Sequence, residues 1–245
     1  MKESSLNLVK RKKTYSTYSV NLYNGDYFVV SHIRKFIVDS ITKYLSPGFT
    51  VVDIACGEQP FCDLIKGMNA TYIGVDIIQN SQNTVDVVAP ITEIPLTSYS
   101  LDLIICTEVL EHVSDTYKAF KELSRLIKPG GVIIITVPFT YPLHEEPFDF
   151  VRLTPYQITQ CARDNNLNIV ELITSGNELE VVATVLDNMW IRMNSKNFSK
   201  NLFFLIGLIS RIVINSVVIV LSKLVGDYLP KKYYLNTLCI LSKNK

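Results

Sequence analysis

The sequence predicts an α/β fold built around a doubly wound, mostly parallel sheet. Short apolar runs of the kind that form buried strands alternate with longer stretches in which apolar residues recur at helical spacing. That alternation is typical of a parallel sheet with helices on both faces. The first apolar run breaks into Ala55-Cys56-Gly57 and the second ends at Asp76, as in α/β units that bind nucleotides at their strand ends.

The predicted elements follow one another without an internal repeat. A leading helix is expected over residues 28–45, because apolar residues lie on one helical face and Pro47-Gly48 follows them. Strands are expected near residues 50–54, 72–76, 84–88, 102–106 and 131–137, with helices between them. Residues 167–173 form a sixth predicted strand. Residues 233–243, after Pro230, form the last one.

Four ordered motifs carry a family resemblance. They are VVDIACGEQPF at 51–61, YIGVDI at 72–77, EIPLTSYSLDLIICTEVLEHVSD at 93–115 and SRLIKPGGVIIITVP at 124–138. Together they resemble the class I S-adenosylmethionine-dependent methyltransferases over residues 45–175. The resemblance implies a Rossmann-like, seven-stranded sheet whose last strand lies antiparallel beside the fifth. It also implies S-adenosylmethionine as the cofactor.

A strand, a loop and a helix followed by an acid are also typical of nicotinamide-dependent dehydrogenases, which are the competing interpretation. Their fingerprint is G-x-G-x-x-G, in which the glycines let the backbone approach a pyrophosphate. Gly57 is followed instead by Glu58-Gln59-Pro60, so the fingerprint is absent.

The resemblance places the cofactor at the carboxyl ends of the first four strands. Asp76 would accept hydrogen bonds from both ribose hydroxyls. The expected cofactor-binding residues are Asp53, Ala55, Cys56, Gly57, Asp76, Ile77, Ile91, Cys106 and Thr107.

The chain departs from the family pattern at two places. Gln59 stands where a second glycine is usual, and Pro60 after it suits the first turn of a helix. Pro90 stands where an acid often binds the adenine amine. Apolar contacts and backbone groups would therefore hold the adenine, and Asp86 is not expected to replace that acid.

The segment 137–158, VPFTYPLHEEPFDFVRLTPYQI, is the expected acceptor site. It resembles a signature of bacterial methyltransferases found with surface-polysaccharide and lipid-glycan pathways. His144 is the candidate general base, since its pKa lies near neutrality. Tyr141 and Phe148 could stack on a substrate ring. Arg152 could bind a substrate anion, or bridge the loop to the next helix. A loop histidine without catalytic role remains the alternative for His144.

A metal site is the alternative chemistry. Glu108, Glu111 and His112 have the spacing E-x-x-E-H, which resembles the magnesium motif of ubiquinone-type and small-RNA O-methyltransferases. His144 would be the further histidine, and the ion would hold and acidify a substrate hydroxyl. Because V-L-E-H-V is also common in metal-free members, we expect no metal.

Composition limits partners and compartment. A net charge of +1 in 245 residues gives no field that would attract nucleic acid. Five cysteines without paired spacing indicate a reducing compartment, the cytoplasm. The N-terminus lacks the apolar core of a secretory signal. Its basic cluster, residues 10–13, is expected to be a solvated arm, with contact to anionic lipid as the alternative.

A long apolar insertion separates the last two strands. Residues 178–193 have a helical pattern, and residues 202–221 are twenty residues with one charge, long enough to span a membrane. Arg211 near the centre would cost about 2.5–3.5 kcal/mol inside a bilayer. Gly207, Arg211, Asn215 and Ser222 share one helical face, which we expect to turn toward the domain or water. Shallow membrane association, packing within the protein or a dimer, and insertion as a hairpin all remain open.

We therefore expect four segments. They are an N-terminal arm and helix (1–46), a cofactor-binding core (47–175), a helical insertion (176–228) and a final strand (229–245). The predicted activity is O-methylation of a small or glycan- or lipid-linked hydroxyl by a cytoplasmic protein, with the inner face of the membrane as a further location. A cofactor-binding protein without turnover and a membrane-tethered scaffold are the alternatives.

Overall fold

The computed structural model describes residue 18, residues 20–194 and residues 200–244. The basic cluster at residues 10–13 lies outside them. In chain order the elements are α1 (Tyr27–Tyr44), β1 (Thr50–Ile54), α2 (Cys62–Gly67), β2 (Thr71–Asp76), β3 (Val87–Val88), β4 (Leu101–Thr107), η1 (Leu110–His112), α3 (Thr116–Leu126), β5 (Ile127–Pro138), α4 (Pro155–Asp164), β6 (Leu167–Ser175), α5 (Glu178–Asn194), α6 (Lys200–Val225), η2 (Gly226–Tyr228) and β7 (Asn236–Lys243).

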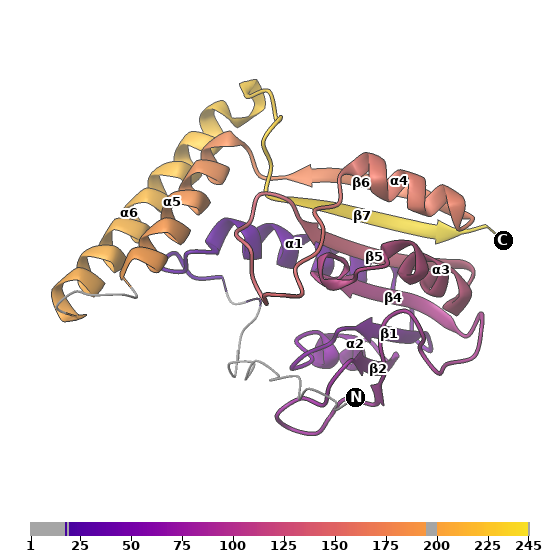
Figure 1. Cartoon of the computed structure of the whole chain (residues 1–245). Coiled ribbons are helices and arrows are strands. Elements are labelled where there is room, and N and C mark those ends of the chain that lie inside the picture. Colours follow the sequence, from indigo (N-terminus) through magenta and orange to yellow (C-terminus); the bar gives the residue numbers. More distant parts are fainter. Residues whose placement is uncertain (1–17, 19, 195–199, 245) are drawn as a thin grey trace.

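The strands form one seven-stranded sheet in the order β3-β2-β1-β4-β5-β7-β6. The pairs β1–β2, β1–β4, β2–β3 and β4–β5 are parallel, and β7 runs antiparallel between β5 and β6. The expected fold is confirmed, including the position of the last strand beside the fifth. All the carboxyl ends of the parallel strands consequently meet at one edge of the sheet (Figure 1).

Two apolar cores cover the two faces of the sheet. Successive β4 side chains alternate between them: Leu103 and Ile105 pack on the side of α1 and α2, and Ile104 and Cys106 on the side of α3 and α4. This alternation follows from the period of two along a strand. Both faces are buried, which explains why the strands read as continuous apolar runs.

Several predicted boundaries differ from the structure: β5 begins at Ile127 instead of residue 131, and β7 at Asn236 instead of residue 233. The third strand was expected over residues 84–88, but only Val87 and Val88 pair with β2. The side chain of Asp86 instead accepts the N–H of Gly74 at 2.7 Å, so a carboxylate replaces a ladder bond there. Pro60 was expected in the first turn of a helix, but α2 begins at Cys62. Gln59 adopts the left-handed conformation (φ 57°) and closes a separate turn before it.

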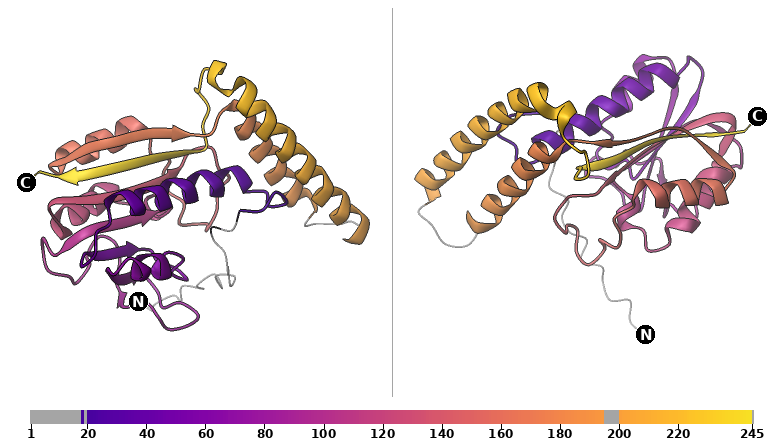
Figure 2. Two further views of the ribbon diagram at one scale, coloured as in Figure 1. Left: turned by 180° about the vertical axis from the view of Figure 1, so that it is seen from behind. Right: turned by 90° about the horizontal axis from the view of Figure 1, so that it is seen from above.

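Helices α5 and α6 lie side by side as a hairpin that projects beyond the end of the sheet (Figures 1 and 2). Helix α6 is continuous rather than a broken pair. Among the described residues, one helical stretch, Gly207–Tyr228, is long and apolar enough to cross a membrane, with a mean hydropathy of 2.0. Only 6% of it is buried in the protein.

Candidate active site

The turn after β1 brings backbone N–H groups to the strand-end edge. Ala55 and Gln59 are left-handed, as is Gly57 (φ 50°). An L-residue is strained in this conformation, which explains why a glycine is usual where Gln59 stands. The Gln59 side chain anchors the turn by donating to the carbonyl of Thr84 at 2.6 Å.

Asp76 ends β2 against this turn. Its side chain is 2% exposed and accepts the N–H of Gly57 at 2.9 Å. The N–H of Ile78 lies 3.3 Å from the other carboxylate oxygen. Two backbone donors therefore fix the carboxylate at the tip of β2, where the ribose contact is predicted.

Asp53 lies deeper, inside β1. The Tyr72 hydroxyl donates to its carboxylate at 2.8 Å, and both groups are buried. Burial raises the pKa of Asp53 to about 7, the Tyr72 bond opposes this, and the nearby Asp76 adds to it. A buried carboxylate with one donor is suited to a cationic neighbour, such as the ammonium group of the cofactor.

The expected adenine contacts differ in exposure. Ile77, directly after Asp76, is 60% exposed, so its side chain is available to a flat ring. Ile91 is 8% exposed and belongs to the core on the α3 and α4 side, so little of its side chain is available to a ligand. The carboxylate of Asp86 accepts the N–H of Gly74, as described above. We therefore still do not expect Asp86 to bind the adenine amine.

The end of β4 carries a contact that the sequence did not predict. Cys106 is fully buried in the core on the α3 and α4 side, so it exposes no atom at the strand-end edge. The Thr107 hydroxyl lies 3.1 Å from the hydroxyl of Tyr18, whose ring packs on Phe61 at 4.9 Å. Tyr18 precedes the first predicted element, and only the fold brings it to the strand ends.

Glu108 does not join the histidines. It adopts a left-handed conformation (φ 51°) and accepts the hydroxyl proton of Thr136 at 2.8 Å. The amide of Asn236, at the start of β7, lies 3.3 Å from its other oxygen. Burial raises its pKa. Glu108, one of the four residues considered as metal ligands, therefore contacts β5 and β7 and not the two histidines.

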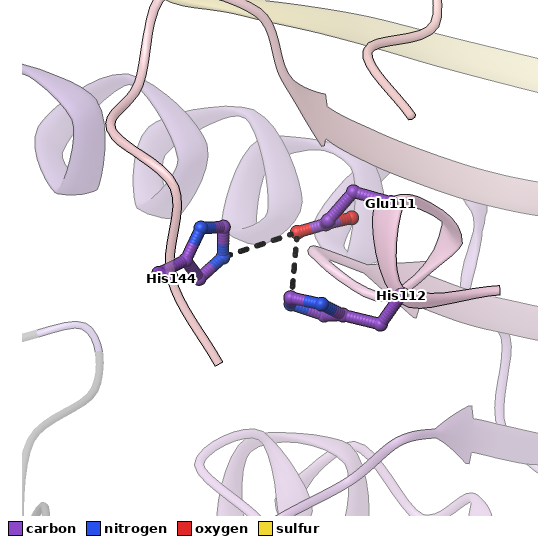
Figure 3. A group of neighbouring side chains, drawn as sticks. All are labelled: Glu111, His112 and His144. Atoms are coloured by element: carbon purple, nitrogen blue, oxygen red, sulfur yellow. Dashed lines mark ion pairs between the residues drawn. The ribbon is translucent and has the colours of Figure 1, made fainter. Parts of the chain in front are cut away.

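The other three residues, Glu111, His112 and His144, lie close together (Figure 3). The Nε2 atoms of His112 and His144 lie 3.7 Å and 3.8 Å from the same oxygen, Oε1 of Glu111. Glu111 is 1% exposed, and neither of its carboxylate oxygens has a hydrogen-bond partner among the described residues. Burial and the neighbouring Glu108 raise its pKa well above the usual value. A buried carboxylate without a donor is costly unless a proton or cation satisfies it.

His144 has a second carboxylate on its other ring nitrogen. Its Nδ1 lies 3.2 Å from Asp149 and 3.2 Å from the carbonyl of Pro142. Two guanidinium nitrogens of Arg152 bond Asp149 and hold its pKa well below the usual range. Arg152 thus positions the loop through contacts within it, and the expected bridge to the next helix is not seen among the described contacts.

The surroundings favour a neutral imidazole. Burial and the neighbouring His112 lower the pKa of His144. With both acceptors at Nδ1, the proton belongs on Nδ1 and the lone pair on Nε2. His144 is therefore set up to accept a proton at Nε2.

Aromatic rings surround this group. Tyr141 meets the ring of His144 edge-on at 5.2 Å, and His112 does so at 4.7 Å. Phe148 is 46% exposed, and its carbonyl lies 2.9 Å from Nδ1 of His112. Tyr141 and Phe148 thus both lie beside the histidines. A groove of about 660 Å³ lies elsewhere, between α1, β6 and α6.

Comparison with known proteins bears on the fold and the cofactor. A family model described as a methyltransferase domain matches residues 52–135, from β1 to β5. Residues 52–135 thus resemble a methyltransferase domain. S-adenosylmethionine is the cofactor of this domain, and its predicted contacts lie within or beside the matched residues.

The chain is 28% identical over 156 residues to a probable S-adenosylmethionine-dependent methyltransferase of Mycolicibacterium smegmatis, covering 60% of this chain and 59% of the relative. It is 28% identical over 103 residues to a ubiquinone biosynthesis O-methyltransferase of Paracidovorax citrulli, covering 36% and 43%. The chain thus spans less than two thirds of these relatives. A SAM-dependent methyltransferase from Archaeoglobus fulgidus shares the fold, with a TM-score of 0.54, 18% identity and coverage of 86% and 94%.

Proposed function

We propose that the protein transfers the methyl group of S-adenosylmethionine to a hydroxyl oxygen, with His144 as the general base. The observation that carries the proposal is the pairing of His144 with Asp149, which leaves Nε2 free to accept a proton. Its position after β5 supports this role, because the chemistry of the fold takes place above the carboxyl ends of the strands.

The sulfonium supplies a methyl group that is already strongly electrophilic, so the protein has to align the acceptor and remove one proton. The acceptor oxygen forms the new bond to the methyl carbon while the sulfur keeps the electrons of the bond that breaks. The proton of the hydroxyl passes to Nε2 of His144. Asp149 stabilises the imidazolium that results, and Arg152 keeps Asp149 ionised.

We infer that the acceptor is a small molecule or a glycan- or lipid-linked hydroxyl. Tyr141 and Phe148 beside the histidines favour a ring-bearing acceptor. The ubiquinone relative is an O-methyltransferase by name, which is consistent with oxygen as the target. A cytoplasmic location at the inner membrane face belongs to the same proposal, with support from the exposed apolar hairpin.

Calorimetric titration with S-adenosylhomocysteine tests the cofactor site. Asp76→Ala should weaken binding at least tenfold, because the ribose would lose charge-assisted hydrogen bonds of about 1.5–3 kcal/mol each. The matched control is Asp102→Ala at the opposite end of the sheet, where Asp102 pairs with Lys128. Equal binding by both variants would remove Asp76 from the site. Binding without transfer to any lipid or glycan extract would favour a protein without turnover.

A second candidate is metal-dependent O-methylation. The unpartnered Glu111 carboxylate favours it, because two histidine nitrogens meet at one of its oxygens. The two nitrogen-to-oxygen separations of 3.7 and 3.8 Å are close to the roughly 3.4 Å between ligands of a tetrahedral ion, and the three ligand atoms all lie within 4.8 Å of one another. Glu111, His112 and His144 would then hold the ion, and His144 could not serve as the base.

Chelation separates the two candidates. If His144 is the base, activity survives EDTA, and added magnesium or zinc changes neither activity nor thermal stability. If the metal site is real, EDTA abolishes activity, zinc or magnesium restores it, and the ion raises the melting temperature of the wild type but not of Glu111→Gln.

A further inference from the structure

Helix α6 is turned with its polar residues inward. Asn215 is fully buried, and its amide donates to the carbonyl of Leu22 at 2.8 Å. Arg211 lies 3.8 Å from the buried carboxylate of Asp187 on α5. The polar stripe expected from the sequence therefore faces the rest of the protein.

The opposite side of α6 is apolar and exposed. Its residues are each 38–66% exposed and recur every three or four positions: Leu205, Ile209, Ile212, Val213, Val217, Val220, Leu221 and Leu224. Helix α5 adds Val182, Val185, Leu186 and Met189, at 40–56% exposure. We call these twelve residues the outer hairpin surface. A water-facing helix normally has the reverse arrangement, and an apolar surface of this extent marks an interaction site.

A single crossing of a membrane does not fit the fold. The hairpin leaves β6 at Ser175 and the chain re-enters the sheet at Asn236, and these two residues are paired neighbours in adjacent strands. Both ends of the insertion therefore lie on the same side of any membrane. Asn215 is also committed to a partner outside the hairpin, and Arg211 pairs with α5, so the polar side of α6 is held against the protein.

The charge of the hairpin favours a bilayer over a second copy of the chain as the partner of the outer hairpin surface. Residues 178–233 contain seven basic and four acidic residues, a net charge of +3 in a chain whose total is +1. Two of the four acids, Glu180 and Asp187, are buried. The hairpin segment thus carries a net positive charge. Like charges oppose the approach of a second hairpin, whereas anionic lipid attracts basic residues that flank an apolar face.

We propose that the outer hairpin surface docks on an anionic lipid bilayer, with α6 lying along the membrane surface. This deepens the membrane contact of the proposed function and rests on that part of it alone. The docked surface would place the acceptor side of the protein near lipid, since Asn236, where the insertion ends, contacts Glu108 at the end of β4. A lipid-linked hydroxyl would then reach the strand ends without leaving the membrane.

Vesicle flotation tests the proposal with a matched pair of variants. Val217 on α6 and Val170 on β6 are both 50% exposed, so an aspartate costs each site similarly. The wild-type chain should float with phosphatidylcholine vesicles that contain phosphatidylglycerol, and less so with pure phosphatidylcholine or at high salt. Val217→Asp should lower the partition coefficient at least tenfold. Val170→Asp should leave it unchanged.

Two other results would overturn the proposal. Equal partition into neutral and anionic vesicles would remove the need for anionic lipid. If the wild type ignored both vesicles, and Val217→Asp turned a dimer into a monomer in sedimentation velocity, the surface would be an interface between copies of the chain. Titration of every variant with S-adenosylhomocysteine verifies folding. Flotation requires no turnover, so its outcome is separate from that of the transferase assays.

Discussion

Single residues near the strand ends carry most of the proposed chemistry. His144 lies between two carboxylates of opposite state: Asp149 is ionised through Arg152, whereas the pKa of Glu111 is raised by burial. The same ring can therefore serve as a base or as a ligand. The geometry allows both roles. His144 can act as a base when Glu111 is protonated, and as a ligand when an ion binds beside Glu111.

The pH dependence of kcat/KM tests the base role. Burial lowers the pKa of His144 below the usual 6.5, and a general base acts in its neutral form. We expect full activity above pH 6.5 and an acid limb below that value. His144→Ala should lose about a hundredfold or more in rate and lose the acid limb, with cofactor affinity unchanged. An intact acid limb in the variant would assign it to another group.

At the scale of elements, the hairpin is held to the domain by apolar residues that pack on the α1 side and by a few buried polar contacts. Asn215 of α6 is the clearest of them, because it satisfies a backbone carbonyl in the segment before α1. This contact fixes which face of α6 remains outside. The polar stripe thus sets the orientation of the helix, and the apolar surface follows from it.

Truncation of this contact should be measurable in the stability of the protein. Asn215→Ala removes the donor from the partly buried carbonyl of Leu22, so we expect a loss of about 1 kcal/mol in the free energy of unfolding by urea. Ser216→Ala is the control, because its hydroxyl bonds only the carbonyl of Ile212 within the same helix. A change within about 0.5 kcal/mol is expected there. Equal losses in both variants would mean that Asn215 does not anchor the hairpin.

At the scale of the whole molecule, buried carboxylates link stability to pH. Asp53 has a pKa of about 7 in the folded protein against 3.8 for an ordinary aspartate. As the pH rises from 4 to 7, the unfolded chain releases this proton before the folded one does. This group alone therefore makes the folded state less stable with rising pH, by an order of a few kcal/mol at most.

Melting temperatures across this range test the linkage. Asp53→Asn keeps an oxygen for the Tyr72 hydroxyl and removes the titration, so its melting temperature should rise relative to the wild type as the pH increases from 4 to 7. Asp102→Asn, whose parent residue pairs with Lys128, should show no such rise. A constant difference between Asp53→Asn and the wild type would place the Asp53 pKa near its ordinary value.

The sequence by itself determined the sheet, the strand-end turn and the cofactor domain. Each depends on local signals: apolar runs for buried strands, small residues after β1, and an acid at the tip of β2. It also indicated the polar face of α6, because helical spacing alone defines a face. The short β3 escaped prediction, since the replacement of a ladder bond by the Asp86 side chain leaves no trace in a hydropathy pattern.

Only the tertiary structure decided which side chains meet. Glu108 and Glu111 share one motif, yet the left-handed backbone at Glu108 turns the first toward Thr136 while the second faces two histidines. Tyr18 reaches Thr107 across 89 positions of sequence. Contacts of this range depend on how the chain folds back over the strand ends, so no local pattern encodes them. The apolar side of α6 is exposed for the same reason, because the partners of its polar side are Leu22, before α1, and Asp187, on α5.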